Sequence, residues 1–222
     1  VLIEASTGTV LYDKKCNKKM YPASITKIMT ALLAIENCKM NDTVVYSKKN
    51  LDSLTAEDSN IQCQVGEKMS VKDCLYALML SSANETATAL AEHIAGSSEA
   101  FAKLMNERAK QAGATDTHFA NPNGLHDDNH YVTAYDMSMI MKAAIQYPVF
   151  LDVIHTTEYT IPANNKRTEP FQSYQRHNML FTTSPYYDAD WWQDRLHRPG
   201  WKNTCDLCKT WKCFTYICCA EI

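Results

Sequence analysis

Residues 22–36 read PASITKIMTALLAIE, a stretch that combines a strong helical pattern with a reactive pair of side chains. A proline precedes an apolar run with helical spacing, which predicts a helix from about Ser24 with one buried face. The apolar positions are Ile25, Ile28, Met29, Leu32 and Leu33. Because residues three apart share a helix face, the amine of Lys27 comes within hydrogen-bond reach of the Ser24 hydroxyl.

Ser24 and Lys27 form a Ser-x-x-Lys motif. A serine is a poor nucleophile until a base takes its proton, and a lysine is such a base only when desolvation or a nearby positive charge lowers its pKa. The surrounding apolar residues could supply the desolvation, and the helix N-terminus favours negative charge on the serine oxygen. Taken alone, this motif is more often a capping serine beside a solvated lysine.

A second motif interrupts the next helical stretch. That stretch opens with a capping box of Ser70 and Asp73, breaks at Ser82-Ala83-Asn84 within LMLSSANETA, and stops at Gly96. Small polar residues at a break between helices can direct a hydroxyl and an amide into a cleft. Although Ser-x-Asn alone is common in turns, the two motifs in this order match two of the three boxes of the penicillin-recognising serine enzymes.

With both motifs in place, the chain closely resembles the D-alanyl-D-alanine carboxypeptidases, which are the low-molecular-mass penicillin-binding proteins. The resemblance covers roughly residues 1 to 190. Besides the two boxes it includes ASTGTVLYDKK (5–15), ALMLSSANETATALAEHIAGS (77–97), THFANPNGLHDDNHYVTAYDM (117–137) and HNMLF (177–181). The related serine β-lactamases commonly carry Ser-Asp-Asn as the second box, so Ala83 favours the carboxypeptidase.

The resemblance implies an α+β fold of the β-lactamase/transpeptidase type, in which an antiparallel sheet of N- and C-terminal strands packs with a helical subdomain. The sequence pattern agrees. It predicts a hairpin in residues 1–13, helices in the middle, among them one capped by Ser98 and one capped by Thr133 that runs up to Pro148, and a strand at 156–161. That order favours terminal strands that meet in one sheet.

The resemblance also implies a role for each motif residue. Ser24 would be the acylated nucleophile, Lys27 its general base and Ser82 a proton relay to the leaving D-alanine. Asn84 would hydrogen-bond the peptide carbonyl of the substrate, and the backbone N–H of Ser24 would help to hold the oxyanion. The implied reaction removes the terminal D-alanine from peptidoglycan stem peptides through an acyl-enzyme, with β-lactams as covalent inhibitors and no cofactor or metal.

Composition sets the wider limits. The chain has 222 residues, of which 45% are hydrophobic and 21% charged, as in an ordinary globular protein. Its net charge of −3 gives no electrostatic reason to expect nucleic acid or an anionic membrane surface as a partner. The chain begins at Val1, so we expect a processed chain or a fragment whose signal peptide is missing, and we expect it to act outside the cytoplasmic membrane.

Two groups of potential metal ligands stand out in the sequence. His126 and His130 flank two aspartates, but their loop is rich in turn formers, so this spacing does not ensure a shared face. His93 lies on a helix flank and is interpreted as structural. The four scattered cysteines show no metal-binding spacing. They are Cys16, Cys38, Cys63 and Cys74.

The third box of the family, Lys-Thr-Gly, is missing from its expected place after SPYYDAD (184–190). In the family its lysine attracts the substrate carboxylate, and its glycine lets the substrate backbone approach a strand closely. The sequence continues instead with Trp191-Trp192-Gln193-Asp194-Arg195, and the later Lys209-Thr210 is followed by the bulky Trp211. We therefore expect little carboxypeptidase activity from this chain.

Composition also changes abruptly after Asp190. All four tryptophans and five of the nine cysteines follow that point. The cysteines are Cys205, Cys208, Cys213, Cys218 and Cys219, and a zinc-binding or redox tail is one alternative interpretation of them.

A frameshift in the gene explains residues 191–222 better than a metal site does. Tryptophan has the single codon TGG, so dropping the first base of codon 191 forces two glycines and permits Gly-Gly-Lys-Thr-Gly directly after Asp190. We therefore divide the chain into a catalytic domain, 1–190, and an out-of-frame tail, 191–222, without a domain of its own. Loss of the last strands predicts poor stability and aggregation.

Overall fold

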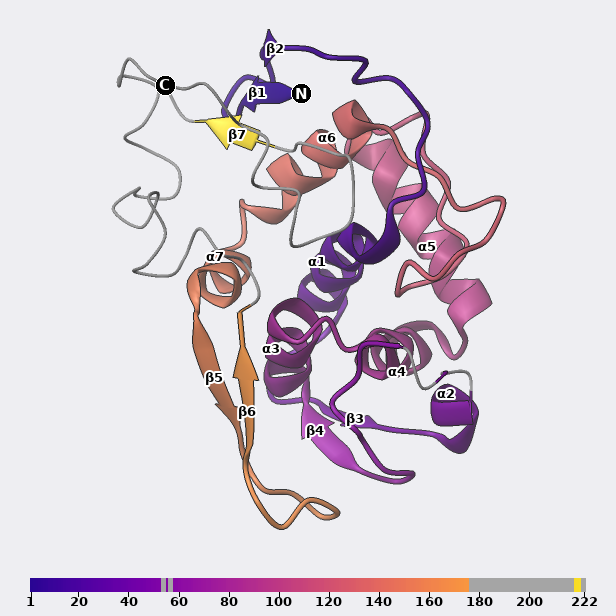
Figure 1. The fold of residues 1–222 in the computed structure, drawn as a ribbon, viewed down its shortest axis with the longest axis vertical. Coiled ribbons are helices and arrows are strands. Elements are labelled where there is room, and N and C mark those ends of the chain that lie inside the picture. The colour runs from indigo at the N-terminus through magenta and orange to yellow at the C-terminus, as the bar shows by residue number, and fades with distance from the viewer. Residues whose placement is uncertain (53–54, 56–57, 176–217, 221–222) are drawn as a thin grey trace.

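The structure is a computed structural model that describes residues 1–52, 55, 58–175 and the backbone of 218–220. Short strands begin and end the described part of the chain, and most helices lie between them (Figure 1). The strands are β1 (Leu2–Glu4), β2 (Val10–Tyr12), β3 (Thr43–Val45), β4 (Lys68–Ser70), β5 (Glu158–Ile161), β6 (Phe171–Tyr174) and β7 (Cys218–Ala220). The helices are the 3-10 turn η1 (Ala23–Thr26), α1 (Lys27–Asn37), α2 (Lys48–Asp52), α3 (Val71–Leu80), α4 (Asn84–Ala95), α5 (Ser98–Gln111), α6 (Ala134–Ala144) and α7 (Pro148–His155).

Helix α1 is the centre of the helical body. It packs against α3, α4, α5, α6 and α7, and Figure 1 shows it enclosed by these helices. Every residue from Lys27 to Ala34 is buried, so the first two turns of α1 are surrounded on all sides. A helix that is buried all round needs apolar residues beyond one stripe, and the run of 28–35 supplies them.

The caps predicted from the sequence are mostly confirmed. The Ser70 hydroxyl accepts from the backbone N–H of Asp73 at the start of α3, and Thr133 accepts from Asp136 at the start of α6. Gly96 ends α4 in the left-handed conformation, with φ at 78°. The cap of α5 was wrong by one residue: Ser97 has extended backbone and accepts from the N–H of Ala100, so Ser98 is the first helical residue.

Helix α7 was not predicted. The sequence pattern ended a helix near Pro148, whereas α6 ends at Ala144 and Pro148 begins the next helix. Proline suits the first turn because the missing N–H has no partner there in any case. Among the described residues no single helix is long and apolar enough to cross a membrane, although the bent pair α6 and α7 meets that test together by length and composition.

Strands β1 and β2 share one sheet with β7, in the order β2-β1-β7, so N- and C-terminal strands meet as predicted. The expectation that the last strands are lost was wrong for β7, which lies in the tail and pairs with β1. The antiparallel arrangement holds for β1 and β2, but β7 runs parallel to β1, with Leu2 opposite Cys218. Nearly the whole chain separates β1 from β7, so no hairpin forces an antiparallel pairing between them. Strand β5 pairs with β6 in a separate hairpin instead of joining the terminal sheet, because a short connection closes at a small entropic cost.

Candidate active site

Ser24 lies in the 3-10 turn η1, one turn before α1 begins at Lys27. Its neighbour Ala23 has a φ of 48°, in the left-handed region that non-glycine residues rarely adopt. This backbone turns the chain sharply into α1 and leaves Ser24 only half-buried. Strain of this kind costs about 1–3 kcal/mol per residue and persists where the surrounding structure holds it.

Lys27 is fully buried, and its amine is held by three acceptors. Nζ donates to Ser24 Oγ at 3.3 Å, to the side-chain Oδ1 of Asn84 at 2.7 Å and to the backbone carbonyl of Asn123 at 2.8 Å. Three acceptors satisfy the three donors of the ammonium form, whereas the neutral amine can donate to Asn84 and Asn123 and accept from the Ser24 hydroxyl. The amine is therefore fixed in position next to the serine.

Burial lowers the pKa of the Lys27 amine from 10.5 to about 7, while the carboxylates of Glu85 and Asp58 act in the opposite direction. Desolvation disfavours the charged form of a lysine, which is the condition that the sequence argument required. At neutral pH a large fraction of this lysine is an uncharged amine that can accept the proton of Ser24. A solvated lysine would be almost entirely protonated.

Ser82 lies at the break between α3 and α4, and its hydroxyl donates to Ser24 Oγ at 3.1 Å. Its φ of 56° is also left-handed, so both serines are held by unusual backbone, at Ala23 and at Ser82 itself. The neighbouring Ser81 points elsewhere and hydrogen-bonds Ser173 Oγ at 2.7 Å. The strained turn thus separates the two adjacent serines and directs Ser82 to Ser24.

Asn84 is the first residue of α4 and is buried. Its Oδ1 accepts from Lys27, and its backbone N–H donates to the carbonyl of Ser59 at 2.8 Å. Since the oxygen end of the amide faces the lysine, the Nδ2 end is the donor that remains for a substrate carbonyl. The structure therefore brings all four residues that the sequence singled out to one place.

The loop 121–125 completes the site, although no motif in the sequence indicated a catalytic role for it. The carbonyl of Asn123 holds Lys27, while Asn121 Oδ1 accepts from the N–H of Gly124 and fixes the turn. Gly124 has a φ of 86°, and a Cβ there would lie 1.9 Å from the carbonyl oxygen of Ala23. The NPNG pattern was a turn signal, but only its contact with the nucleophile turn shows why a glycine is required.

Glu85 is a buried carboxylate whose charge acts on Lys27, and no sequence motif indicated it. Its Oε1 accepts from the backbone N–H of Ile61 at 2.6 Å, while Oε2 has no hydrogen-bond partner in the part of the chain that the structure describes. Burial raises the pKa of this carboxyl, and hydrogen bonds and the Lys27 charge partly oppose that effect. Glu85 therefore influences the charge of Lys27 without contacting Ser24.

His126 and His130 do not form a site together. His126 is exposed and lies 3.4 Å from Asp128, whereas His130 is buried with its Nε2 2.9 Å from Thr26 Oγ1. Burial lowers the pKa of His130 to about 4, so it is neutral and hydrogen-bonds Thr26, which directly precedes Lys27. The expected third-box region, Lys209-Thr210 and the side chains of the tail cysteines lie outside the described residues.

The fold and this site are those of the transpeptidase-like class of proteins. Residues 1–189 match the family described as D-alanyl-D-alanine carboxypeptidase, and the chain belongs to that family. In structure the chain is similar to the Streptomyces K15 DD-transpeptidase, with a TM-score of 0.75 and 28% identity over 82% of this chain and 74% of that one.

Two curated relatives show the extent of the likeness. The D-alanyl-D-alanine carboxypeptidase DacF of Bacillus subtilis is 43% identical over 66% of this chain. A D-alanyl-D-alanine endopeptidase of Escherichia coli is 30% identical over 94% of this chain. The chain spans only 38% and 64% of the lengths of these two relatives.

Proposed function

We propose that the chain carries the acyl-transfer site of a serine D-Ala-D-Ala carboxypeptidase, which removes the terminal D-alanine from peptidoglycan stem peptides. One observation carries the proposal: a buried lysine with a pKa of about 7 lies 3.3 Å from Ser24 Oγ, with a second hydroxyl, that of Ser82, 3.1 Å from the same oxygen. A nucleophile, a base and a relay thus converge at a single atom.

In the first step Ser24 Oγ attacks the carbonyl carbon between the two terminal D-alanines. The new C–O bond forms as Lys27 takes the serine proton, and the backbone N–H of Ser24 stabilises the oxyanion. The C–N bond then breaks, and Ser82 relays a proton from Lys27 to the leaving amine. Free D-alanine and an ester on Ser24 result.

In the second step water attacks the ester carbonyl. The Lys27 amine, neutral again after the first step, takes a proton from the water, and the C–O bond to Ser24 breaks. The serine oxygen recovers a proton from the lysine, so the site returns to its starting state. Because Lys27 is held by Asn84 and Asn123 as well as by Ser24, it stays in place through both steps.

Asn84 orients the substrate. Its Nδ2 can donate to a peptide carbonyl while its Oδ1 accepts from Lys27. The family's Lys-Thr-Gly would bind the terminal carboxylate, and the sequence after Asp190 lacks it. Binding of the substrate tail is therefore weakened in this chain, and carboxypeptidase turnover is expected to be slow. β-Lactams, which acylate the same serine, are the covalent inhibitors expected.

We propose that the protein acts outside the cytoplasmic membrane, in the periplasm or on the outer face, with a role in the cell wall and in cell shape, because that is where the proposed stem-peptide substrate lies. No metal, cofactor or nucleic acid enters the proposed reaction. The family membership and the serine–lysine geometry support this location indirectly, since peptidoglycan is assembled there.

A fluorescent penicillin tests the proposal directly. The chain should form a covalent adduct at Ser24, identified by peptide mapping, and the adduct should vanish in Ser24→Ala. A gene with one base removed from codon 191 provides the matched comparison, because it restores the reading frame that permits Lys-Thr-Gly. Faster labelling of that product than of the chain as written is expected, and equal rates would refute the impairment.

A non-catalytic remnant that only binds muropeptide is the second candidate, and the missing Lys-Thr-Gly favours it. It predicts that radiolabelled muropeptide binds but that no penicillin adduct forms on Ser24, so the labelling experiment separates the two. A serine β-lactamase is a further alternative. It would hydrolyse penicillin rapidly, whereas a carboxypeptidase keeps the adduct.

A further inference from the structure

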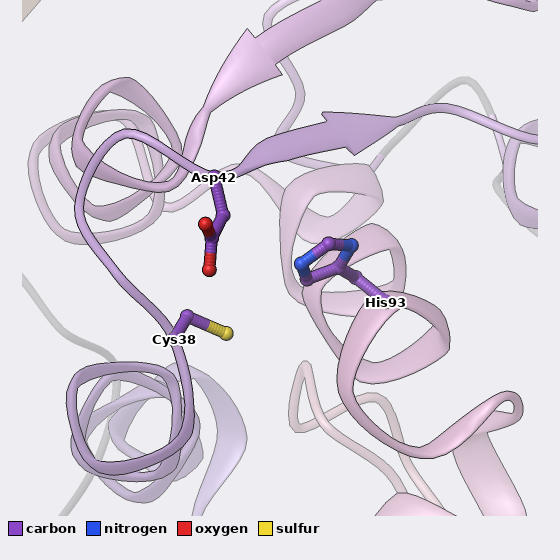
Figure 2. Close-up of side chains that lie close together, drawn as sticks. All are labelled: Cys38, Asp42 and His93. Atoms are coloured by element: carbon purple, nitrogen blue, oxygen red, sulfur yellow. The ribbon is translucent and has the colours of Figure 1, made fainter.

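Three potential metal ligands from separate elements converge on the far side of the helical body from Ser24. They are Cys38 at the carboxyl end of α1, Asp42 in the turn before β3, and His93 in the last turn of α4. One ligand atom of each lies within 4.8 Å of the other two, and Figure 2 shows the three side chains directed toward a common space.

The turn that carries two of these ligands is well defined. The backbone N–H of Asp42 donates to the carbonyl of Lys39, and the N–H of Lys39 donates to Asp42 Oδ2 at 2.8 Å. The Asp42 carbonyl in turn accepts from Val71 at the start of α3. Cys38 and Asp42 are thus held by a closed turn, with the carboxylate oriented and its remaining lone pairs available.

The surroundings favour a cation. The carboxyl ends of α1 and α4 both lie at this cluster, and the last turn of a helix carries a partial negative charge. Asp42 adds a full negative charge.

We propose that Cys38, Asp42 and His93 bind a zinc ion, with water as the fourth ligand. A thiolate, an imidazole and a carboxylate are the ligand types that zinc combines in tetrahedral sites, whereas calcium and magnesium prefer oxygen alone. The ion deprotonates the thiol that coordinates it. His93 is exposed, so its side chain is free to close the remaining distance to the other two ligands.

The site would join the two helices that carry the active-site residues. Lys27 begins α1 and Asn84 begins α4, and two of the zinc ligands, Cys38 and His93, lie at the opposite ends of the same helices. Zinc binds the folded chain and not a preformed site in the unfolded one, so it stabilises the fold. It takes no part in the chemistry at Ser24.

Metal analysis and Co²⁺ spectroscopy of the full chain test the site. We expect tight binding of one zinc ion, a rise in Tm on adding zinc, and a thiolate-to-Co²⁺ charge-transfer band. Loss of a direct ligand in Cys38→Ser, Asp42→Asn or His93→Gln should weaken binding by at least ~100-fold, since even supporting residues cost 10–100-fold. His93→Gln is the cleanest variant because an exposed side chain does not hold the fold.

Matched controls separate this site from the tail. Cys63→Ser removes another half-buried thiol and should leave zinc binding intact. Binding that survives Cys38→Ser but is lost in the double variant Cys205→Ser/Cys208→Ser would assign the metal to the tail and overturn the proposal. Absence of any zinc binding by the parent chain would overturn it as well. The rate of Ser24 labelling should be the same in His93→Gln and the parent, which keeps this test independent of the proposed function.

Discussion

Helices α1 and α4 have residues close together at both ends, and the two ends differ in nearly every physical respect. At the amino ends Lys27 and Asn84 are buried and hydrogen-bonded, next to backbone in unusual conformations. At the carboxyl ends Cys38 is half-buried and His93 is exposed, and no hydrogen bond joins these two side chains. The same pair of helices thus provides one rigid end and one open end.

Helix polarity adds an electrostatic difference between the two ends. Amino ends present N–H groups and positive partial charge, which suit a developing oxyanion on a serine ester and a neutral lysine. Carboxyl ends present carbonyls and negative partial charge, which suit a cation. Because the amino ends of α1 and α4 meet and their carboxyl ends also meet, the pair suits anionic chemistry at one end and the proposed metal ion at the other.

The largest expected effect is at the amino ends. Lys27→Gln keeps the length and a donor but removes the base, so the rate of penicillin labelling should fall by about 10²–10⁴-fold. Lys103→Gln, which changes an exposed lysine of α5, is the control and should label at the parent rate. Equal labelling of both variants would exclude Lys27 as the base.

Gly124→Ala tests how tightly the rigid end is packed. The new Cβ would lie 1.9 Å from the Ala23 carbonyl oxygen, so the loop or the nucleophile turn must move. We expect the free energy of unfolding to drop by more than about 2 kcal/mol, measured by urea denaturation. Gly96→Ala has a similar φ of 78° but meets nothing within 4 Å. The free energy of unfolding of Gly96→Ala should therefore drop by only about 1 kcal/mol, which is the cost of the backbone strain.

The pH dependence of labelling tests the pKa of Lys27. The neutral amine is the base, so the rate should rise about tenfold per pH unit below about 7 and level off above it. Glu85→Gln keeps an acceptor for Ile61 but removes the charge that raises the pKa of Lys27, so the rise should move to lower pH. An unchanged profile would mean that Glu85 is uncharged in the parent.

The same pKa has a consequence for stability. The unfolded lysine titrates near 10.5 and the folded one near 7, so the unfolded chain binds more protons between these values. Burial of Lys27 therefore costs less free energy as the pH rises from 7 to 10.5, and the folded chain becomes more stable over that range. The free energy of unfolding in urea should be measured for the parent and for Lys27→Gln between pH 7 and 10.5. The value for the parent minus that for the variant should increase with pH.

The smallest effect is expected at Ala23. Its φ of 48° is one that glycine adopts without strain, so Ala23→Gly should stabilise the fold by roughly 0.5–1 kcal/mol. Ala112→Gly is the matched control, because Ala112 has a φ of −79° and gains nothing from glycine. A loss of stability at Ala23 would show that the turn is not strained.

Local patterns in the chain singled out the candidate catalytic residues, and the family resemblance assigned their roles. Helical spacing puts Ser24 and Lys27 on one face, and caps and breaks located the ends of α3 and α4 near Ser82 and Asn84. These inferences succeed because they depend on interactions within a few residues. The family resemblance rests on the same short segments, and it added the meeting of Ser24 with Ser82 that local spacing does not supply.

Contacts between distant segments could not be inferred in the same way. Three such contacts join residues that lie far apart in the chain. The Asn123 carbonyl accepts from Lys27, the charge of the buried Glu85 acts on Lys27, and β7 pairs in parallel with β1. The meeting of Cys38 with His93 is of the same kind. Spacing along the chain carries no information on such pairs, because burial and packing in three dimensions determine which side chains meet.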